Sequence, residues 1–376
     1  MNTSAQIAVN SKITPNLYQQ LRDELDAWLG MTIQYKIVEM PIIISREFAS
    51  LLEESAVSIA VQAAGTEPSK PLFCVVDFAV CTADDGTFIP KLIELQGFPS
   101  LYCYQLLLAE TYSRVYDLHG FDPLLSGLDR ETYLDYLSKA VYADADPSAT
   151  FLVEIDPSLQ KTRPDFIAFE KLIGLKTINI RDITRNGRSL FTTIDGRTTK
   201  IDRIFNRAIL DEMDDLGVEL NFSWNDDLDV AWAGHPSWYF KISKQTLPYL
   251  HHPSVPRTVF VSDLSSIPAN LNDYVLKPLF SFAGKGVTVG PDSSHIEQIP
   301  DHDRSKWIIQ ERVRYADCVP TPTGTNKVEI RIMLIWLPEA EKPLPVITLA
   351  RTGRGDLMGA RYNTMPWTGS GTCLTK

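Results

Sequence analysis

The stretch Val275-Leu-Lys-Pro-Leu-Phe-Ser-Phe-Ala-Gly-Lys-Gly-Val287 is the part of this chain that decides its fold class. An apolar run typical of a strand brings Lys277 to a loop of small residues that includes Ser281, Gly284 and Gly286. Glycines lack a Cβ, so the backbone N–H groups of such a loop can close around phosphate oxygens, and the lysine adds a positive charge. The pattern is not a Walker loop, which opens a helix; it predicts a β-hairpin that covers a phosphate. A glycine-rich hairpin can also be purely structural, so the assignment depends on the other motifs.

The composition is that of an ordinary soluble protein of two or three domains. The chain has 376 residues, of which 44% are hydrophobic and 22% charged, and it is too long for one compact core. Its formal net charge is −11, which argues against nucleic-acid or anionic-membrane partners, because those surfaces need clustered Lys and Arg. A nucleotide such as ATP needs only a local positive site and a metal, so ATP is compatible with this charge.

The cysteines and the N-terminus indicate the cellular location. The five cysteines are scattered, and no pair has the spacing of a zinc or redox site, so we expect reduced thiols. The N-terminus lacks the pattern of a signal peptide, and no apolar run approaches the ~18 residues of a membrane helix. We expect a cytoplasmic protein; the sequence does not indicate its oligomeric state.

Apolar periodicity predicts helices around a β-hairpin in the first third of the chain. The helices are expected over residues 16–29, 46–63 and 102–116. Strand patterns over residues 72–80 and 88–95 predict the hairpin.

The rest of the chain predicts a small α/β unit followed by a β-rich part. A strand at 150–155, a helix at 165–174 and a strand at 176–180 indicate an open α/β domain. The further elements that we expect are a hairpin at 191–201, helices at 203–213 and 244–250, strands at 259–261, 307–311, 328–336 and 346–351, and a loop at 352–371.

Several motifs of the last third resemble those of the ATP-grasp superfamily. Ser243-Lys244, followed by Pro256-Arg-Thr258, resembles its first phosphate lysine and the linker after it. Lys277 and the small-residue loop resemble the second lysine and the phosphate-covering hairpin. Ile308-Ile-Gln-Glu311 resembles the hinge strand, so the resemblance implies nucleotide contacts at Gln310 and Glu311.

Two later motifs resemble elements that contact the substrate or the reacting groups. Glu329-Ile-Arg331 is similar to the acidic-x-Arg strand of the superfamily. Arg351, followed by Asn363 in a glycine-rich loop, resembles elements of peptide ligases that add glutamate to a protein tail. The resemblance implies a catalytic role for Arg331 and substrate contacts for Glu329, Arg351 and Asn363.

The metal-binding strands of the superfamily have their counterpart at the front of this chain. Asp77 and the run Leu92-Ile-Glu94-Leu-Gln96-Gly-Phe-Pro99 are similar to the terminal Asp…Glu-x-Asn-x-x-Pro signature. This order implies a circular permutation, and the chain is most similar to glutathionylspermidine-synthetase-like carboxylate–amine ligases. Gln96 replaces the asparagine of the family and supplies the same carbonyl oxygen on a longer arm.

We therefore expect an α/β (α+β) protein with a circularly permuted ATP-grasp fold and a small open α/β substrate domain. Residues 1–125 would hold the N-terminal helices and the permuted terminal hairpin, and residues 126–234 the substrate domain. Residues 235–376 would form the rest of the ATP-grasp domain. The motifs cover 70–100 and 235–376 and, more loosely, 150–210.

The candidate metal ligands are Asp77, Glu94 and Gln96. Asp77 interrupts an apolar strand, where an unpaired charge is costly, so it is expected to bind magnesium or to form a buried salt bridge. Glu94 and Gln96 share one face of their strand by its two-residue period, and the alternative for them is a solvent-facing edge. For Glu329 and Arg331, which also share a face, the alternative is an exposed sheet surface.

The positive candidates fall into a phosphate set and a substrate set. Lys277 and Lys244 are expected at the phosphates of ATP, with Lys241 as the competitor of Lys244. Arg203 and Arg207 lie four residues apart on a predicted helix, so one of them could hold a substrate carboxylate. A surface salt bridge is the alternative for this pair.

Together with these residues, the resemblance implies an ADP-forming carbon–nitrogen ligase that uses ATP and Mg²⁺. A small-molecule carboxylate would attack the γ-phosphate to give an acyl phosphate, and an amine of an amino acid, peptide or polyamine would displace the phosphate. The alternatives are a small-molecule kinase with the same fold and a non-catalytic nucleotide-binding protein.

Overall fold

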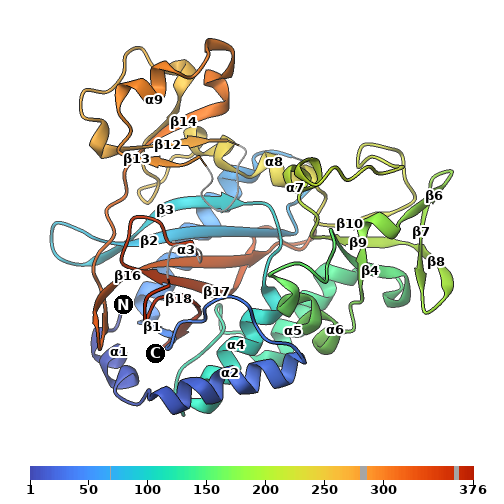
Figure 1. The fold of residues 1–376 in the computed structure, drawn as a ribbon, viewed down its shortest axis with the longest axis horizontal. Helices are drawn as coiled ribbons and strands as arrows, with labels where there is room; N and C mark the ends of the chain where they lie inside the picture. The colour runs from blue at the N-terminus through green and yellow to red at the C-terminus, as the bar shows by residue number, and fades with distance from the viewer. Residues whose placement is uncertain (68, 280–285, 360–363) are drawn as a thin grey trace.

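The computed structural model describes residues 1–67, 69–279, 286–359 and 364–376 (Figure 1). Its described strands form a six-stranded sheet, two four-stranded sheets, a three-stranded sheet and a two-stranded sheet. The α-helices are α1 (Thr3–Asn10), α2 (Pro15–Leu29), α3 (Arg46–Ala64), α4 (Tyr102–Val115), α5 (Arg130–Tyr142), α6 (Arg163–Ile173), α7 (Leu210–Asp215), α8 (Ser237–Lys241) and α9 (Ser293–Glu297).

The six-stranded antiparallel sheet joins the front of the chain to its end. The strand order is β18-β17-β16-β2-β3, and β15 pairs with the beginning of β16. The predicted front hairpin is therefore confirmed as β2 and β3, and β2 lies beside a strand from the last part of the chain. The strands of this sheet are β2 (Phe73–Thr82), β3 (Phe88–Gln96), β15 (Val319–Thr321), β16 (Gly324–Ile335), β17 (Leu344–Gly353) and β18 (Gly369–Gly371).

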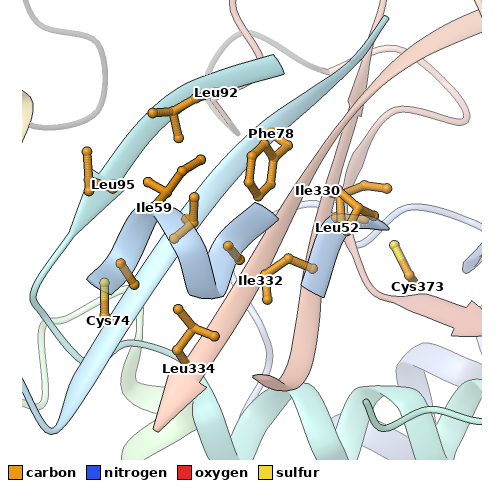
Figure 2. Close-up of a cluster of buried hydrophobic side chains, with 14 of the residues drawn as sticks. Leu52, Ile59, Cys74, Phe78, Leu92, Leu95, Ile330, Ile332, Leu334 and Cys373 are labelled. Carbon is orange, nitrogen blue, oxygen red and sulfur yellow. The ribbon is translucent and has the colours of Figure 1, made fainter. Parts of the chain in front are cut away.

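Alternating side chains of this sheet pack on helices from both sides. On one face, Phe78 of β2 and Ile332 of β16 pack against α3, whose side chains include Leu52 and Ile59 (Figure 2). On the other face, residues such as Met333 join a second cluster with the buried side chains of α4, α5 and α6. Successive side chains of a strand point to opposite faces, and both faces of this sheet are covered. Most residues of β2 and β16 are therefore buried.

The middle of the chain forms a four-stranded parallel sheet of order β10-β9-β4-β5. Its strands are β4 (Thr150–Glu154), β5 (Thr177–Asn179), β9 (Arg203–Asn206) and β10 (Ala231–Ala233). Helix α6 connects β4 to β5, which confirms the predicted β-α-β unit. A three-stranded sheet of β6 (Thr184–Asn186), β7 (Ser189–Ile194) and β8 (Arg197–Ile201) confirms the predicted hairpin.

The predicted helix over residues 203–213 is wrong at its beginning. Residues Arg203–Asn206 form strand β9, which pairs with β4 on one side and β10 on the other, and α7 begins only at Leu210. Phe205 contacts the rings of Phe73 and Phe169 in the core. Pairing on both edges and this packing outweigh the helical spacing of the sequence.

The glycine stretch lies in the second four-stranded sheet, of order β11-β14-β12-β13. The strands are β11 (Thr258–Phe260), β12 (Tyr274–Pro278), β13 (Thr288–Val289) and β14 (Trp307–Glu311), and with α9 they lie at the top of Figure 1. Strands β12 and β13 pair in antiparallel fashion, so the predicted hairpin is confirmed. Ser281 and Gly284 lie outside the described residues. The predicted helix at 244–250 is a 3₁₀ helix, η3 (Lys244–Tyr249), which contains Pro248.

Strand β19 (Cys373–Thr375) pairs in parallel with β1 (Ile42–Ile44), which follows α2, and the two form a two-stranded sheet. Among the described helices none combines the length and the apolar character needed to cross a membrane.

Gly97 fixes the end of β3 against α8, and we predict that it does not tolerate a side chain. Its N–H donates to the carbonyl of Ile242 at 2.9 Å, and a Cβ would lie 2.5 Å from the backbone oxygen of Trp238. Gly97→Ala should lower the free energy of unfolding by about 1–3 kcal/mol, measured by urea denaturation. The control is Gly120→Ala, whose Cβ would meet no atom within 4 Å. Equal stability of the two variants would contradict this prediction.

Candidate functional site

One face of the six-stranded sheet carries a row of charged side chains. The pairing of β2 places Asp77 opposite Arg331 on one side and opposite Glu94 on the other. The pairing of β16 with β17 places Glu329 opposite Arg351. Residues that lie opposite each other in a sheet project from the same face, so the row is continuous across the four strands.

The central members of this row neutralise one another. Nε and Nη2 of Arg331 donate to the two carboxylate oxygens of Asp77 at 2.5 and 2.6 Å. Arg351 donates to Glu329 and, at 3.4 Å, to Asp77. The Tyr315 hydroxyl donates to Glu329 at 3.1 Å; its irregular segment gave no signal in the sequence. Two carboxylates and two guanidinium groups make a charge-balanced, buried set.

The ionisation of this set follows from its pairing. Burial by itself disfavours the charged carboxylate, but Arg331 and Arg351 hold the pKa of Asp77 below its usual value. For Glu329 burial is the stronger effect and raises its pKa, although Arg351 opposes the shift. Of the two acids, Asp77 is therefore the one that is firmly ionised.

Lys277 contacts the sheet through a β-bulge in β3. Asp77 pairs with Glu94 and Phe78 with Leu92, which leaves Ile93 as the extra residue. The carbonyl of Ile93 accepts a hydrogen bond from Nζ of Lys277 at 3.1 Å. This hydrogen bond connects the four-stranded sheet β11-β14-β12-β13 to the six-stranded sheet, next to the row of charged side chains.

Gln310 orients this lysine from the neighbouring strand. Its Oε1 accepts from Lys277 at 2.6 Å, and its Nε2 donates to Oγ1 of Thr258 at 3.0 Å. Burial lowers the pKa of Lys277 to about 8, while the carboxylate of Glu94 opposes this shift and the charge of Lys244 adds to it. Lys277 is therefore a buried cation within a small polar group.

The structure distinguishes Lys244 from its competitor Lys241. Nζ of Lys244 lies 3.9 Å from Oε1 of Glu94 and is buried, whereas Lys241 is on the surface and pairs with Glu67. Oε1 of Glu94 also accepts a hydrogen bond from Nε2 of Gln96 at 2.9 Å. The glutamate and the glutamine that the sequence placed on one face are therefore neighbours, and Lys244 is beside them.

The fit of these residues to magnesium is uneven. The Glu94 side chain is 28% exposed, and its oxygen donors together with that of Gln96 suit an ion that takes one or two carboxylates and completes its shell with waters and phosphates. The Asp77 side chain is 4% exposed and both its oxygens accept from Arg331. Within the described ranges no three His, Cys, Asp or Glu side chains gather as a metal site.

Arg203 and Arg207 do not act as a pair, because they lie at opposite ends of β9. Arg203 donates to the carbonyls of Val141 and Ala140, at 2.7 and 3.2 Å, where α5 ends. This contact satisfies carbonyls that the helix leaves unpaired, so the expected substrate role of Arg203 is replaced by a structural one.

Arg207 lies at the carboxyl edge of the parallel sheet. The chain passes from β4 to β5 on one side and then to β9 on the other, so the point between β4 and β9 is a topological switch point, where open α/β sheets bind ligands. Arg207 follows β9, and Glu154 ends β4, with 4.0 Å between Nη2 and Oε2. Sequence analysis missed Glu154, although an acid at the end of a predicted buried strand was the available signal.

The surroundings of Arg207 leave part of its guanidinium group unused. Its guanidinium stacks on the rings of Phe98 and Phe166 and donates to the carbonyl of Pro99. Nε is buried and has no hydrogen-bond partner in the described part of the chain. Burial raises the pKa of Glu154 to about 7, although Arg207 opposes the shift. Arg207 is thus a buried guanidinium beside an acid that is only partly ionised near neutral pH.

The remaining predicted residues lie at the margin of the site or outside the described residues. Glu311 is exposed, and its carboxylate accepts from the N–H of Arg257 at 3.4 Å. Gly286 has φ of 75° and faces Pro278 so closely that a Cβ would come within 3.0 Å of it. Asn363 lies outside the described residues, as do Ser281 and Gly284.

Comparison with known proteins identifies the fold. No protein-family model and no curated protein matches the chain. Among solved structures it is similar to a glutathione synthetase-like effector from Globodera pallida in its apo form, with a TM-score of 0.58 and 13% identity over 96% of this chain and 97% of that chain. At this identity the likeness concerns the fold alone. The chain has a glutathione synthetase-like fold; circular permutation and likeness to glutathionylspermidine synthetase stay predictions.

The raised pKa of Glu154 predicts a pH dependence of stability. The folded state holds the proton up to about pH 7, whereas an unfolded glutamate releases it near pH 4.5, so the contribution of Glu154 to stability is fully present below pH 4.5 and is lost as pH rises through this window. The loss would be at most about 3 kcal/mol. Glu154→Gln should flatten the pH dependence of the unfolding free energy between pH 5 and 7.5, with Glu311→Gln as the exposed control. An unchanged slope in Glu154→Gln would contradict this assignment.

Proposed function

We propose that this protein is an ATP-dependent carboxylate–amine ligase that works through an acyl phosphate and releases ADP and phosphate. The observation that carries the proposal is the convergence of two buried lysines on the end of β3, where Lys244 lies beside Glu94 and Lys277 donates to the carbonyl of Ile93. The glutathione synthetase-like fold supports the reaction class. The pairing of the front hairpin with β16 supports a circularly permuted ATP-grasp arrangement.

The first part of the proposed site binds the phosphates of ATP. Lys277 and Lys244 neutralise phosphate oxygens, which lets an anionic carboxylate approach the γ-phosphate. Glu94 and Gln96 would hold Mg²⁺, which when bound supplies further positive charge to the same phosphates. Arg331 is the proposed catalytic arginine beside them.

The outer contacts of the nucleotide complete this part of the proposal. Ser281, Gly284 and Gly286 belong to the loop that would cover the phosphates and exclude water. The strand that carries Gln310 and Glu311 would meet the adenosine. Gln310 acts on the phosphates through Lys277, which it holds in place.

The second part of the proposed site binds the acid substrate. Arg207 would pair with a carboxylate of the substrate, because its planar guanidinium is preorganised by Phe98 and Phe166 and its Nε has no partner in the described part. Glu329, Arg351 and Asn363 are the further substrate contacts that we propose.

The reaction then follows in two steps. The reacting carboxylate oxygen forms a bond to the γ-phosphorus, and the bond from that phosphorus to the bridging oxygen breaks and releases ADP. The amine of an amino acid, peptide or polyamine attacks the carbonyl carbon of the acyl phosphate, and inorganic phosphate leaves. An acyl phosphate is reactive enough that no strong base is needed.

Lys277→Ala should abolish ADP release by removing the buried charge from the phosphates. The assay incubates the protein with magnesium ATP and pools of amino acids, small peptides and polyamines and follows ADP and phosphate. The matched control is Lys241→Ala, which removes an exposed lysine paired with Glu67 and should keep full activity. Pool-dependent release of ADP without free phosphate would indicate the kinase alternative, and full activity of Lys277→Ala would sink the site assignment.

Arg207 and Arg203 form a second matched pair. Arg207→Lys should raise the KM for the acid substrate by about tenfold or more, because a lysine cannot replace the planar fork. Arg203→Lys should leave this KM unchanged, since Arg203 bonds the end of α5 at the other end of β9. Circular dichroism checks that both variants fold. Similar KM values for the two variants would contradict the assignment of Arg207.

A further inference from the structure

The position of Asp77 differs from that of an open metal ligand. It lies in the middle of the six-stranded sheet, between β16 and β3, and its side chain is 4% exposed. Two nitrogens of Arg331 hold its two oxygens in a bidentate pair, at 2.5 and 2.6 Å. A third donor, Nη1 of Arg351, lies 3.4 Å away.

A magnesium ion at Asp77 would meet both a steric and an electrostatic obstacle. Mg²⁺ requires an octahedral shell and retains several waters, and both oxygens of the buried Asp77 carboxylate already accept hydrogen bonds from Arg331, so a hydrated ion would have to displace that pair. The ion would also lie against the guanidinium groups of Arg331 and Arg351, which already balance the charges of Asp77 and Glu329. Glu94, one strand away, is more open, because its side chain is 28% exposed, and the cation beside it is Lys244, at 3.9 Å.

We propose that Asp77 is a positioning residue that fixes the guanidinium of Arg331, and that it does not ligate magnesium. Of the three candidate metal ligands, Glu94 and Gln96 are then the two that would bind the ion. The statement about magnesium rests on the proposed function, whereas the clamp on Arg331 does not.

The ion pair with Asp77 fixes one edge of the Arg331 guanidinium and leaves its other nitrogen for a further contact. Asp77 occupies the edge of the guanidinium formed by Nε and Nη2, which fixes the plane of the group. Nη1 donates to none of the residues that the structure describes. A guanidinium whose plane is fixed and whose remaining nitrogen is available can contact a phosphate or acyl oxygen with little loss of side-chain freedom.

The first experiment measures magnesium dependence without turnover. Calorimetry determines the affinity for the non-hydrolysable analogue AMP-PNP over a series of Mg²⁺ concentrations. The test variant is the double substitution Asp77→Asn with Arg331→Gln, and its reference is Arg331→Gln alone, so that both proteins lack the arginine and differ only at Asp77. The comparison variant is Glu94→Gln.

We expect substitution of Asp77 and substitution of Glu94 to have different effects on the Mg²⁺ dependence of AMP-PNP binding. The Mg²⁺ concentration at half-maximal binding should differ by no more than about twofold between the double variant and Arg331→Gln, and it should rise by roughly tenfold or more from wild type to Glu94→Gln. A shift from Arg331→Gln to the double variant as large as the shift caused by Glu94→Gln would overturn the proposal.

The second experiment tests the clamp by itself, through urea unfolding of the two single variants and the double variant. For a bidentate pair, the loss of stability in the double variant should be clearly smaller than the sum of the two single losses. Additive losses of stability would contradict the proposal that Asp77 positions Arg331. A wild-type protein that binds no AMP-PNP with Mg²⁺ would overturn the proposed function, and the unfolding cycle would still decide the role of Asp77.

Discussion

The bidentate pair between Asp77 and Arg331 is the interaction on which the arrangement of the site depends. It joins a strand near the front of the chain to a strand near its end, so it exists only when β2 and β16 are paired in one register. A slip of one residue would turn every side chain of a strand to the other face and would bury both charges without partners. The hydrophobic faces on α3 and α4 and the ion pair therefore specify the same register.

The end of β3 connects the two parts of the proposed site. Glu94 lies beside Lys244 and accepts from Gln96, and one residue after Gly97 the ring of Phe98 lies against the guanidinium of Arg207. The segment that would hold Mg²⁺ at the phosphates and the wall of the acid subsite are thus a few residues apart at the end of one strand. This proximity is what a transfer of phosphate to a bound carboxylate requires.

Much of the local structure follows from sequence patterns. The front hairpin, the β-α-β unit and the hairpin of the glycine stretch are present where the patterns predict them. The error at β9 has a physical reason: Arg203–Asn206 is a short central strand, and its conformation is set by β4 and β10, which are distant in the sequence. The same error made Arg203 and Arg207 look like neighbours on a helix, while the strand places them at opposite ends.

The sequence by itself determined which residue types this protein offers for chemistry: Lys277 before a glycine loop, and the acid–amide pair Glu94 and Gln96 on one face. These follow from spacing within a few residues, which local geometry fixes. Only the tertiary structure decided what the buried charges contact. Asp77 is paired with Arg331, Lys244 rather than Lys241 lies beside Glu94, and Glu154 meets Arg207, because ion pairs depend on which strands become neighbours. Pairing between distant strands is settled by the whole core, and no local pattern records it.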